Sequence, residues 1–169
     1  MIKTVYCFII CLLISGMQAC TSTNQSDGYI GRAVKIIDGD TFDLLMENNQ
    51  KVRVRMHGID CPERGMDFYK AAKEGLGNFC NNQGLKVVVR DKDQYGRTVA
   101  DVYTADNKWI NLEMVKAGLA WHYTHYDNDR RLDDAEQSAR AARLGLWSLD
   151  NPTPPWEWRK EKRNEAVGK

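Results

Sequence analysis

The sequence lacks an excess of charge of either sign, with 24 basic and 23 acidic residues among 169 and a formal net charge of +1. A protein that coats duplex nucleic acid carries a visible surplus of lysine and arginine, so the sequence argues against that class. The proportions of 43% hydrophobic and 28% charged residues exclude collagen-like, coiled-coil and wholly disordered chains. We expect one globular domain with short appendages.

Histidine and cysteine are too few and too scattered to indicate a zinc site. The three histidines and five cysteines form no CxxC pair and show no zinc spacing. Three of the cysteines fall within the first 20 residues, which leaves Cys61 and Cys80 in the body of the chain. These two either pair in an oxidising compartment or are separate, small, buried hydrophobic residues, and the sequence leaves both alternatives open.

The N-terminal apolar run, VYCFIICLLISGM, has the length of a signal-peptide core rather than of a membrane span. We therefore predict a secretory signal peptide at residues 1–19 and a flexible tether at residues 20–28. The end of the signal is similar to a bacterial lipoprotein signal, which implies acylation of Cys20 and attachment to a membrane. The expected location is the cell envelope, with the outer membrane favoured in a Gram-negative source. Secretion without a lipid anchor is the alternative.

The mature chain has the pattern of an α+β, mainly β fold. Strands are expected at residues 29–37, 41–47, 51–57, 85–91 and 97–103, and helices at about 66–81, 111–117 and 130–144. The first three strands are expected to be antiparallel. This order is typical of a five-stranded, partly open barrel of the OB type, here with about three helices.

The expected domain covers residues 29–149 and is followed by a Pro/Trp-containing and charged tail at residues 150–169. We expect the segment PTPPWEW to pack on the domain surface and the last ten residues to be mobile. His122 and His125 are expected at the surface.

Acidic residues gather near two expected strand ends. Asp38 and Asp40 flank Gly39, so in extended backbone both side chains point the same way, and the glycine permits a bend that lets them converge. Asp60 and Glu63 lie in a loop that leaves the third strand. Converging carboxylates repel one another unless a cation or a basic group joins them, and oxygen-rich sites suit Ca²⁺ or Mg²⁺. Ordinary charged turns are the alternative interpretation of each segment.

Two arginines accompany these acidic residues. Arg55 alternates away from the core-facing Val54 and Met56, and Arg97 follows Tyr95 in a turn that enters the fifth strand. A guanidinium binds phosphate with two hydrogen bonds, and a tyrosine covers a base or hydrogen-bonds a phosphate. Carboxylates for a metal, a candidate base and two arginines are together what phosphodiester cleavage requires.

Five motifs between residues 31 and 147 resemble, in order, those of the staphylococcal nuclease (thermonuclease) family. They are DGDT, R-x-x-G-I-D-x-P-E, D-x-Y-G-R, GLAWHY and A-R-x-x-R-x-G-L-W. The resemblance implies that Asp40, Asp60 and the backbone carbonyl of Cys61 bind Ca²⁺, with Asp38 and Thr41 adjacent to the metal.

The same resemblance assigns the catalytic and substrate-binding roles. It implies that Arg55 and Arg97 bind and stabilise the phosphate and that Glu63 is the general base. Tyr95 and Tyr123 are the implied substrate contacts, although the spacing does not decide between Tyr123 and Tyr126.

The implied reaction is calcium-dependent hydrolysis of DNA and RNA, preferentially single-stranded or frayed, to leave 3′-phosphate ends, and the expected enzyme is a monomer. The alternative is a non-catalytic OB-fold module that binds nucleic acid or a protein at the cell envelope. Members that only bind are expected to have lost some of the charged residues, and this sequence keeps them all.

Overall fold

The computed structural model describes residues 28–168 and contains a closed five-stranded barrel with the strand order β1-β2-β3-β6-β5. Its strands are β1 (Gly28–Ile36), β2 (Thr41–Met46), β3 (Lys51–Met56), β5 (Leu85–Lys92) and β6 (Thr98–Thr104). Neighbouring strands are antiparallel except β3 and β6, which are parallel. The expected OB-type α+β fold is thus confirmed, and β1 pairs with β5 so that the barrel is closed rather than partly open.

Alternating side chains of the strands fill the barrel. Phe42 and Leu44 of β2 pack with Val54 and Met56 of β3, and all four are buried. The pairing register shifts in the middle of β1 and near the end of β5. Such irregularities bend a strand and increase its twist, which a small closed barrel requires.

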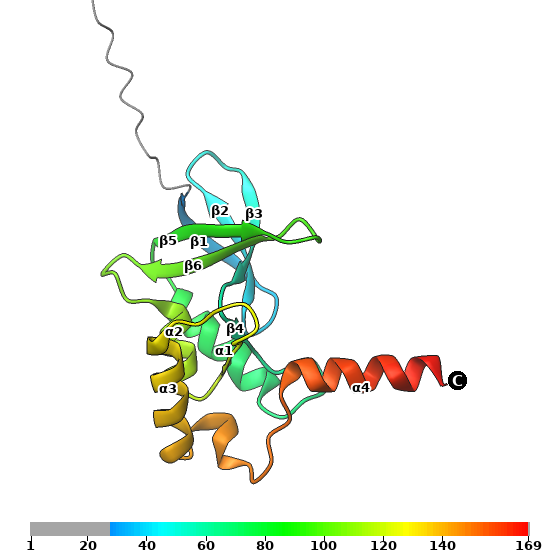
Figure 1. Cartoon of the computed structure of the whole chain (residues 1–169). Coiled ribbons are helices and arrows are strands. Elements are labelled where there is room, and N and C mark those ends of the chain that lie inside the picture. The colour runs from blue at the N-terminus through cyan, green and yellow to red at the C-terminus, as the bar shows by residue number, and fades with distance from the viewer. Residues whose placement is uncertain (1–27, 169) are drawn as a thin grey trace, which may run out of the picture.

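Three helices lie on one side of the barrel, with the third packed on the second (Figure 1). They are α1 (Tyr69–Cys80), α2 (Ile110–Lys116) and α3 (Arg130–Ala141), and a 3₁₀ helix, η1 (Gly145–Ser148), follows α3. The buried faces of α1 and α2 include Leu76 and Met114, which belong to the same apolar cluster as the barrel core. The first turn of α3 is capped by Asp129, whose side chain accepts a hydrogen bond from the backbone N–H of Arg131.

A second, two-stranded sheet joins the middle of the chain to the segment before α3. Strand β4 (Ile59–Asp60) pairs antiparallel with β7 (Trp121–His122). The expectation that His122 lies at the surface is wrong, because this pairing buries it beside Asp127. Two-residue strands carry too short a pattern to be recognised from sequence.

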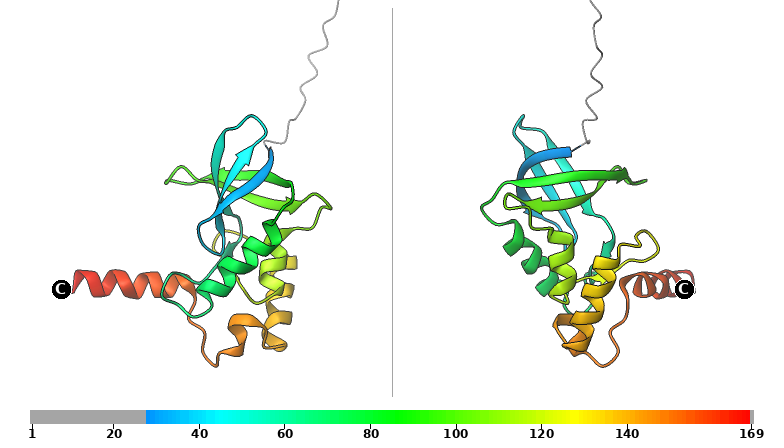
Figure 2. Two further views of the ribbon diagram at one scale, coloured as in Figure 1. Left: turned by 180° about the vertical axis from the view of Figure 1, so that it is seen from behind. Right: turned by 60° about the vertical axis from the view of Figure 1, so that its left-hand side comes forward.

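The C-terminal tail forms a fourth helix, α4 (Pro155–Val167), which is the main departure from the expected fold. As expected, the PTPPWEW segment packs on the domain: Trp156 contacts Trp121, with 5.7 Å between ring centroids. Residues 160–167, which belong to the stretch expected to be mobile, continue this helix. Figures 1 and 2 show α4 projecting away from the rest of the domain. Its charged residues are good helix formers but mark no apolar stripe, so periodicity did not reveal the helix.

Within residues 28–168, none of the helices combines the length and the apolar composition needed to span a bilayer. The predicted signal peptide, nearly all of the tether and the acylation site Cys20 lie outside the described residues.

Candidate active site

A cleft of about 980 Å³ lies where the β1–β2 loop, β4 and the β5–β6 turn meet. Nearly all of the predicted site residues line it, namely Asp38, Asp40, Arg55, Asp60, Cys61, Glu63, Tyr95, Arg97 and Tyr123. Thr41 lies next to the cleft, where its hydroxyl donates to Asp40 over 3.0 Å. The fold therefore gathers into one place the segments that the sequence motifs had singled out separately.

Asp40 is held in a buried position by its neighbours. Its Oδ2 atom accepts a hydrogen bond of 2.9 Å from the backbone N–H of Cys61. Gly39 makes this approach possible, because a Cβ atom at that position would lie 2.7 Å from the Cβ of Cys61 and 2.8 Å from the Cβ of Ala72. The glycine is thus required for close packing of the β1–β2 loop against β4, in addition to the bend that we expected.

Arg55 lies at the centre of the acidic cluster. It pairs in register with Thr41 of β2 and Val99 of β6, so strands on both sides fix its backbone. Its side chain is 14% exposed, with Nη1 3.1 Å from Asp40 Oδ2 and Nη2 3.0 Å from Asp60 Oδ1. Burial alone would lower the pKa of Arg55, but the two carboxylates outweigh burial and raise it. Arg55 is therefore a permanent, rigidly placed cation.

The carboxylates of the cluster carry more negative charge than Arg55 neutralises. Burial and the neighbouring Asp40 raise the pKa of Asp38 to about 6. Burial also raises the pKa of Asp60, although Arg159 and Arg55 act in the opposite direction. These shifts reflect the free-energy cost of bringing several carboxylates together away from water, a cost that a bound cation reduces.

Arg159 of α4 is a second arginine in this cluster. Its Nη2 lies 2.8 Å from Asp60 Oδ2, and its Nη1 lies 2.7 Å from Glu63 Oε1 and 3.2 Å from Asp60 Oδ1. Burial alone would lower the pKa of Arg159, but Asp60 and Glu63 outweigh burial and raise it. Nothing in the sequence pattern indicated these contacts, because the partners are 99 and 96 residues apart and α4 has no recognisable motif.

Arg97 and Tyr95 lie on the other wall of the cleft, in the β5–β6 turn. The structure does not pair Arg97 with the acidic cluster; its Nε lies 2.6 Å from Asp93 Oδ2. Its guanidinium is 5.5 Å from the centre of the Tyr95 ring. Because the Tyr95 side chain is among the exposed large hydrophobic groups, its outer face is open to a ligand.

Both tyrosines between which the sequence left a choice line the cleft. Tyr123 stacks on Trp156 of α4, with 4.9 Å between ring centroids and 3° between ring planes. Tyr126 meets Tyr123 edge-on at 4.9 Å and is 66% exposed. One face of Tyr123 is thus already covered by α4.

The structure also resolves the choice left open for the two cysteines of the domain. Cys61 and Cys80 are separate, buried, free thiols. Burial raises the pKa of the Cys80 thiol to about 12 and, together with Asp40, that of the Cys61 thiol well above its ordinary value. Both thiols are therefore protonated at neutral pH, and for Cys61 only the backbone carbonyl suits a hard cation.

The donor chemistry of the cleft fits Ca²⁺, since Asp40 and Asp60 offer buried carboxylate oxygens and Cys61, which also lines the cleft, offers a backbone carbonyl. Yet among residues 28–168 no three Asp, Glu, His or Cys side chains already converge as a metal site. The contacts explain this difference, because Arg55 and Arg159 engage the carboxylates that a cation would use.

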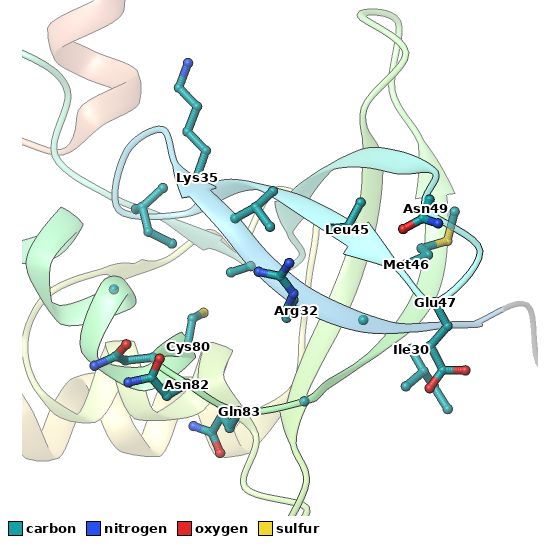
Figure 3. A pocket seen from close by; sticks show the side chains of 17 residues that line it. Ile30, Arg32, Lys35, Leu45, Met46, Glu47, Asn49, Cys80, Asn82 and Gln83 are labelled. Carbon is teal, nitrogen blue, oxygen red and sulfur yellow. The ribbon is translucent and has the colours of Figure 1, made fainter.

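A separate hollow of about 830 Å³ is formed by β1, the end of β2 and the C-terminal end of α1 (Figure 3). Among the described residues, Glu47 is the one acidic side chain that lines it, and no predicted site residue does. We therefore assign the candidate active site to the larger cleft.

Fold and site together define an OB-type barrel with a mixed carboxylate and arginine cleft at its edge. A family model described as staphylococcal nuclease homologue matches residues 53–149. The chain belongs to this family. The matched range includes Arg55, Asp60, Glu63 and Arg97 and begins after Asp40.

Similar proteins occur in both bacteria and plants. The micrococcal nuclease of Shigella flexneri is 39% identical over 146 residues, which cover 80% of this chain and 83% of that protein. An uncharacterized endonuclease of Haemophilus influenzae is 36% identical over 152 residues, which cover 90% of this chain and 83% of that protein. The staphylococcal-like nuclease CAN1 of Arabidopsis thaliana is 46% identical over 114 residues, which cover 68% of this chain. The chain spans only 34% to 39% of the length of three of its plant relatives.

Proposed function

We propose that the protein is a Ca²⁺-dependent nuclease that hydrolyses phosphodiester bonds of DNA and RNA and leaves 3′-phosphate ends. The observation that carries this proposal is the meeting of buried Asp40 and Asp60, partly buried Arg55 and the accessible carboxylate of Glu63 in one cleft. Membership of the staphylococcal nuclease homologue family and the names of the relatives support it.

The metal would be held by Asp40, Asp60 and the backbone carbonyl of Cys61, with Asp38 and Thr41 adjacent. When bound, Ca²⁺ supplies positive charge beside the phosphate and favours ionisation of a water molecule. Arg55 contributes a guanidinium whose direction is fixed by hydrogen bonds of 2.9 Å to the carbonyls of Met56 and Ile59. This fixed cation stabilises the negative charge that develops on the phosphate during attack.

In the proposed reaction, Glu63 accepts the proton of the attacking water. Its side chain is 38% exposed, which leaves it accessible to water. The water oxygen bonds to phosphorus, the bond from phosphorus to the 5′ oxygen breaks, and that oxygen leaves and takes a proton from solvent. The phosphate stays on the 3′ side. Arg97 exchanges Asp93 for a phosphate oxygen, and Tyr95 and Tyr123 stack on bases, which favours single-stranded or frayed substrates.

The direct test is incubation of the purified protein with single-stranded DNA and with RNA, in Ca²⁺ and in chelator, followed by analysis of the product ends by mass spectrometry. We expect cleavage in Ca²⁺ but not in chelator, and we expect products with 3′-phosphate ends. Binding of the oligonucleotide without cleavage in Ca²⁺ would contradict the proposal and favour the non-catalytic module.

We also propose that the protein is exported and anchored to the cell envelope through acylated Cys20. The N-terminal apolar run and the residues around Cys20 support this. Mass spectrometry of the N-terminus of the mature protein should find lipid on Cys20. An unmodified N-terminus after residue 19 would indicate secretion without an anchor, and retention of Met1 would contradict export.

A further inference from the structure

The guanidinium groups of Arg55 and Arg159 together occupy most of the acceptor positions of Asp60, and Arg159 alone contacts both of its oxygens. Asp60 Oδ1 contacts Arg55 at 3.0 Å and Arg159 at 3.2 Å, and Oδ2 contacts Arg159 at 2.8 Å. An ionised carboxylate has about four acceptor positions, so these donors take most of them. The second Nη1 contact of Arg159, 2.7 Å to Glu63, ties the candidate metal ligand and the candidate base to one cation.

The charge of the cluster also depends on Arg159. The cleft brings together Asp38, Asp40, Asp60 and Glu63. Arg55 and Arg159 form ion pairs with the last three of these carboxylates. The side chain of Asp60 is only 2% exposed, so solvent screens its interactions weakly. A divalent cation that approaches Asp60 is therefore repelled by two neighbouring guanidinium groups, of which only Arg55 belongs to the barrel.

Arg159 is attached to the domain through the first turn of α4. Trp156 precedes it by three residues, so the two side chains lie on the same side of the helix. Trp156 packs against Trp121 and stacks on Tyr123, whereas every described residue from 160 onward is exposed. The Arg159 side chain is itself 33% exposed. Arg159 is thus the outermost contact of α4 with the domain, and it can leave Asp60 while Trp156 stays packed.

We propose that Arg159 competes with Ca²⁺ for Asp60, so that α4 sets the calcium affinity of the site. This inference rests on the proposed Ca²⁺-dependent function. Arg55 cannot have the same role, because its strand is paired on both sides and its guanidinium is also bound to two backbone carbonyls. Release of Arg159 frees Oδ2 of Asp60, leaves Oδ1 in contact with Arg55 alone and removes one positive charge from the cluster. Each of these changes favours a divalent cation.

The test compares Ca²⁺ binding by calorimetry in the full chain, R159Q and R163Q. Arg163 lies on the exposed part of the same helix, so R163Q makes the same change in net charge without touching the cleft. We expect R159Q to bind Ca²⁺ about tenfold more tightly, as is reasonable for loss of one cation from a partly buried cluster. R163Q should stay within about twofold of the unchanged chain, because solvent screens a distant surface charge.

The outcomes distinguish the two proposals. Equal or weaker Ca²⁺ binding by R159Q, with binding by the unchanged chain intact, overturns the competition by Arg159 and leaves the proposed function standing. Absence of Ca²⁺ binding in all three proteins overturns the proposed calcium dependence itself.

Hydrogen exchange supplies a second measurement that does not use activity or a variant. Saturating Ca²⁺ should speed amide exchange over residues 159–166 of α4, because release of Arg159 removes the outermost contact of the helix. Exchange in β3 should not accelerate. Unchanged or slower exchange in this part of α4 at saturating Ca²⁺ would overturn the inference.

Discussion

The backbone N–H of Cys61 donates to Oδ2 of Asp40 over 2.9 Å, and this bond joins the residue that follows β4 to the loop that precedes β2. The two chain segments that supply the candidate calcium ligands are therefore locked together by the protein itself. Pre-organisation of this kind reduces the free energy needed to order ligands when a cation binds.

This close approach predicts a specific role for Gly39. We expect G39A to lower the free energy of unfolding by about 1–3 kcal/mol, because the added methyl group overlaps Cys61 and Ala72. G84A is the matched control, since nothing lies within 4 Å of a Cβ at Gly84. Its free energy of unfolding should be unchanged or higher by up to about 1 kcal/mol. Urea unfolding in chelator measures both, and equal effects of the two changes would contradict the packing argument.

Arg55 is predicted to be essential for stability as well as for chemistry. The R55M substitution leaves buried Asp40 and Asp60 without their barrel cation, and we expect a loss of about 3–5 kcal/mol in the free energy of unfolding. R53M removes an arginine from the same strand, but its partner Asp43 lies near the surface and Arg53 is half exposed. That control should lose at most about 1 kcal/mol. Similar losses in the two variants would show that burial of the Arg55 ion pairs does not increase their contribution to stability.

The role of Glu63 predicts a selective effect on turnover. In the Ca²⁺-dependent assay, E63Q should lower kcat by about 10²–10⁴-fold, because a general base acts in the chemical step. Substrate affinity should change little. E157Q, on the exposed side of α4, should leave both parameters unchanged. A fall in affinity with kcat preserved would assign Glu63 to binding instead.

The environment of Asp129, which lies outside the cleft, leads us to expect that stability depends on pH. Its hydrogen bond from Arg131 lowers the pKa of Asp129 from 3.8 to about 2, despite partial burial. A lowered pKa means that the folded state favours the ionised carboxylate. Its contribution is therefore complete above about pH 4 and declines as the pH falls towards 2.

We accordingly expect D129A to lower the free energy of unfolding by about 1 kcal/mol at pH 7, mainly through loss of the helix cap. The difference from the unchanged chain should be constant down to about pH 4 and smaller below it. D129N keeps a capping oxygen and should lose less at pH 7. A difference that grows below pH 4 would contradict the assignment.

The barrel could be predicted because alternation along β2 and β3 is strict and places Phe42, Leu44, Val54 and Met56 on the inner face. The acidic residues and Arg55 could be predicted as a site because each lies beside a glycine, a strand end or a recognisable motif. That these segments meet in one cleft follows from the fold. From the sequence, this convergence could be expected only because the motifs resemble those of a known family.

The role of Arg159 in the cluster could not be predicted. Helix α4 contacts the domain through Trp156 and one ion-pair cluster, and such contacts leave no periodic pattern in the sequence. The burial of His122 could not be predicted for a related reason, because a two-residue strand is defined by its partner and not by its own composition. Arg97 lies in the turn before β6, as expected, but its pairing with Asp93 depends on a local turn geometry that residue types alone do not fix.

The pairing of Arg55 with strands on both sides has a consequence for how the cluster responds to heat. The backbone of Arg55 is released only when β3 separates from β2 and β6, which is global unfolding, whereas the backbone of Arg159 is released when the outer part of α4 detaches. The contacts of Arg55 and Arg159 with the same carboxylate cluster should therefore have very different lifetimes. On warming, the cleft should lose the charge of Arg159 well before the barrel melts, so that the acidic cluster is most open to a competing cation just below the melting temperature.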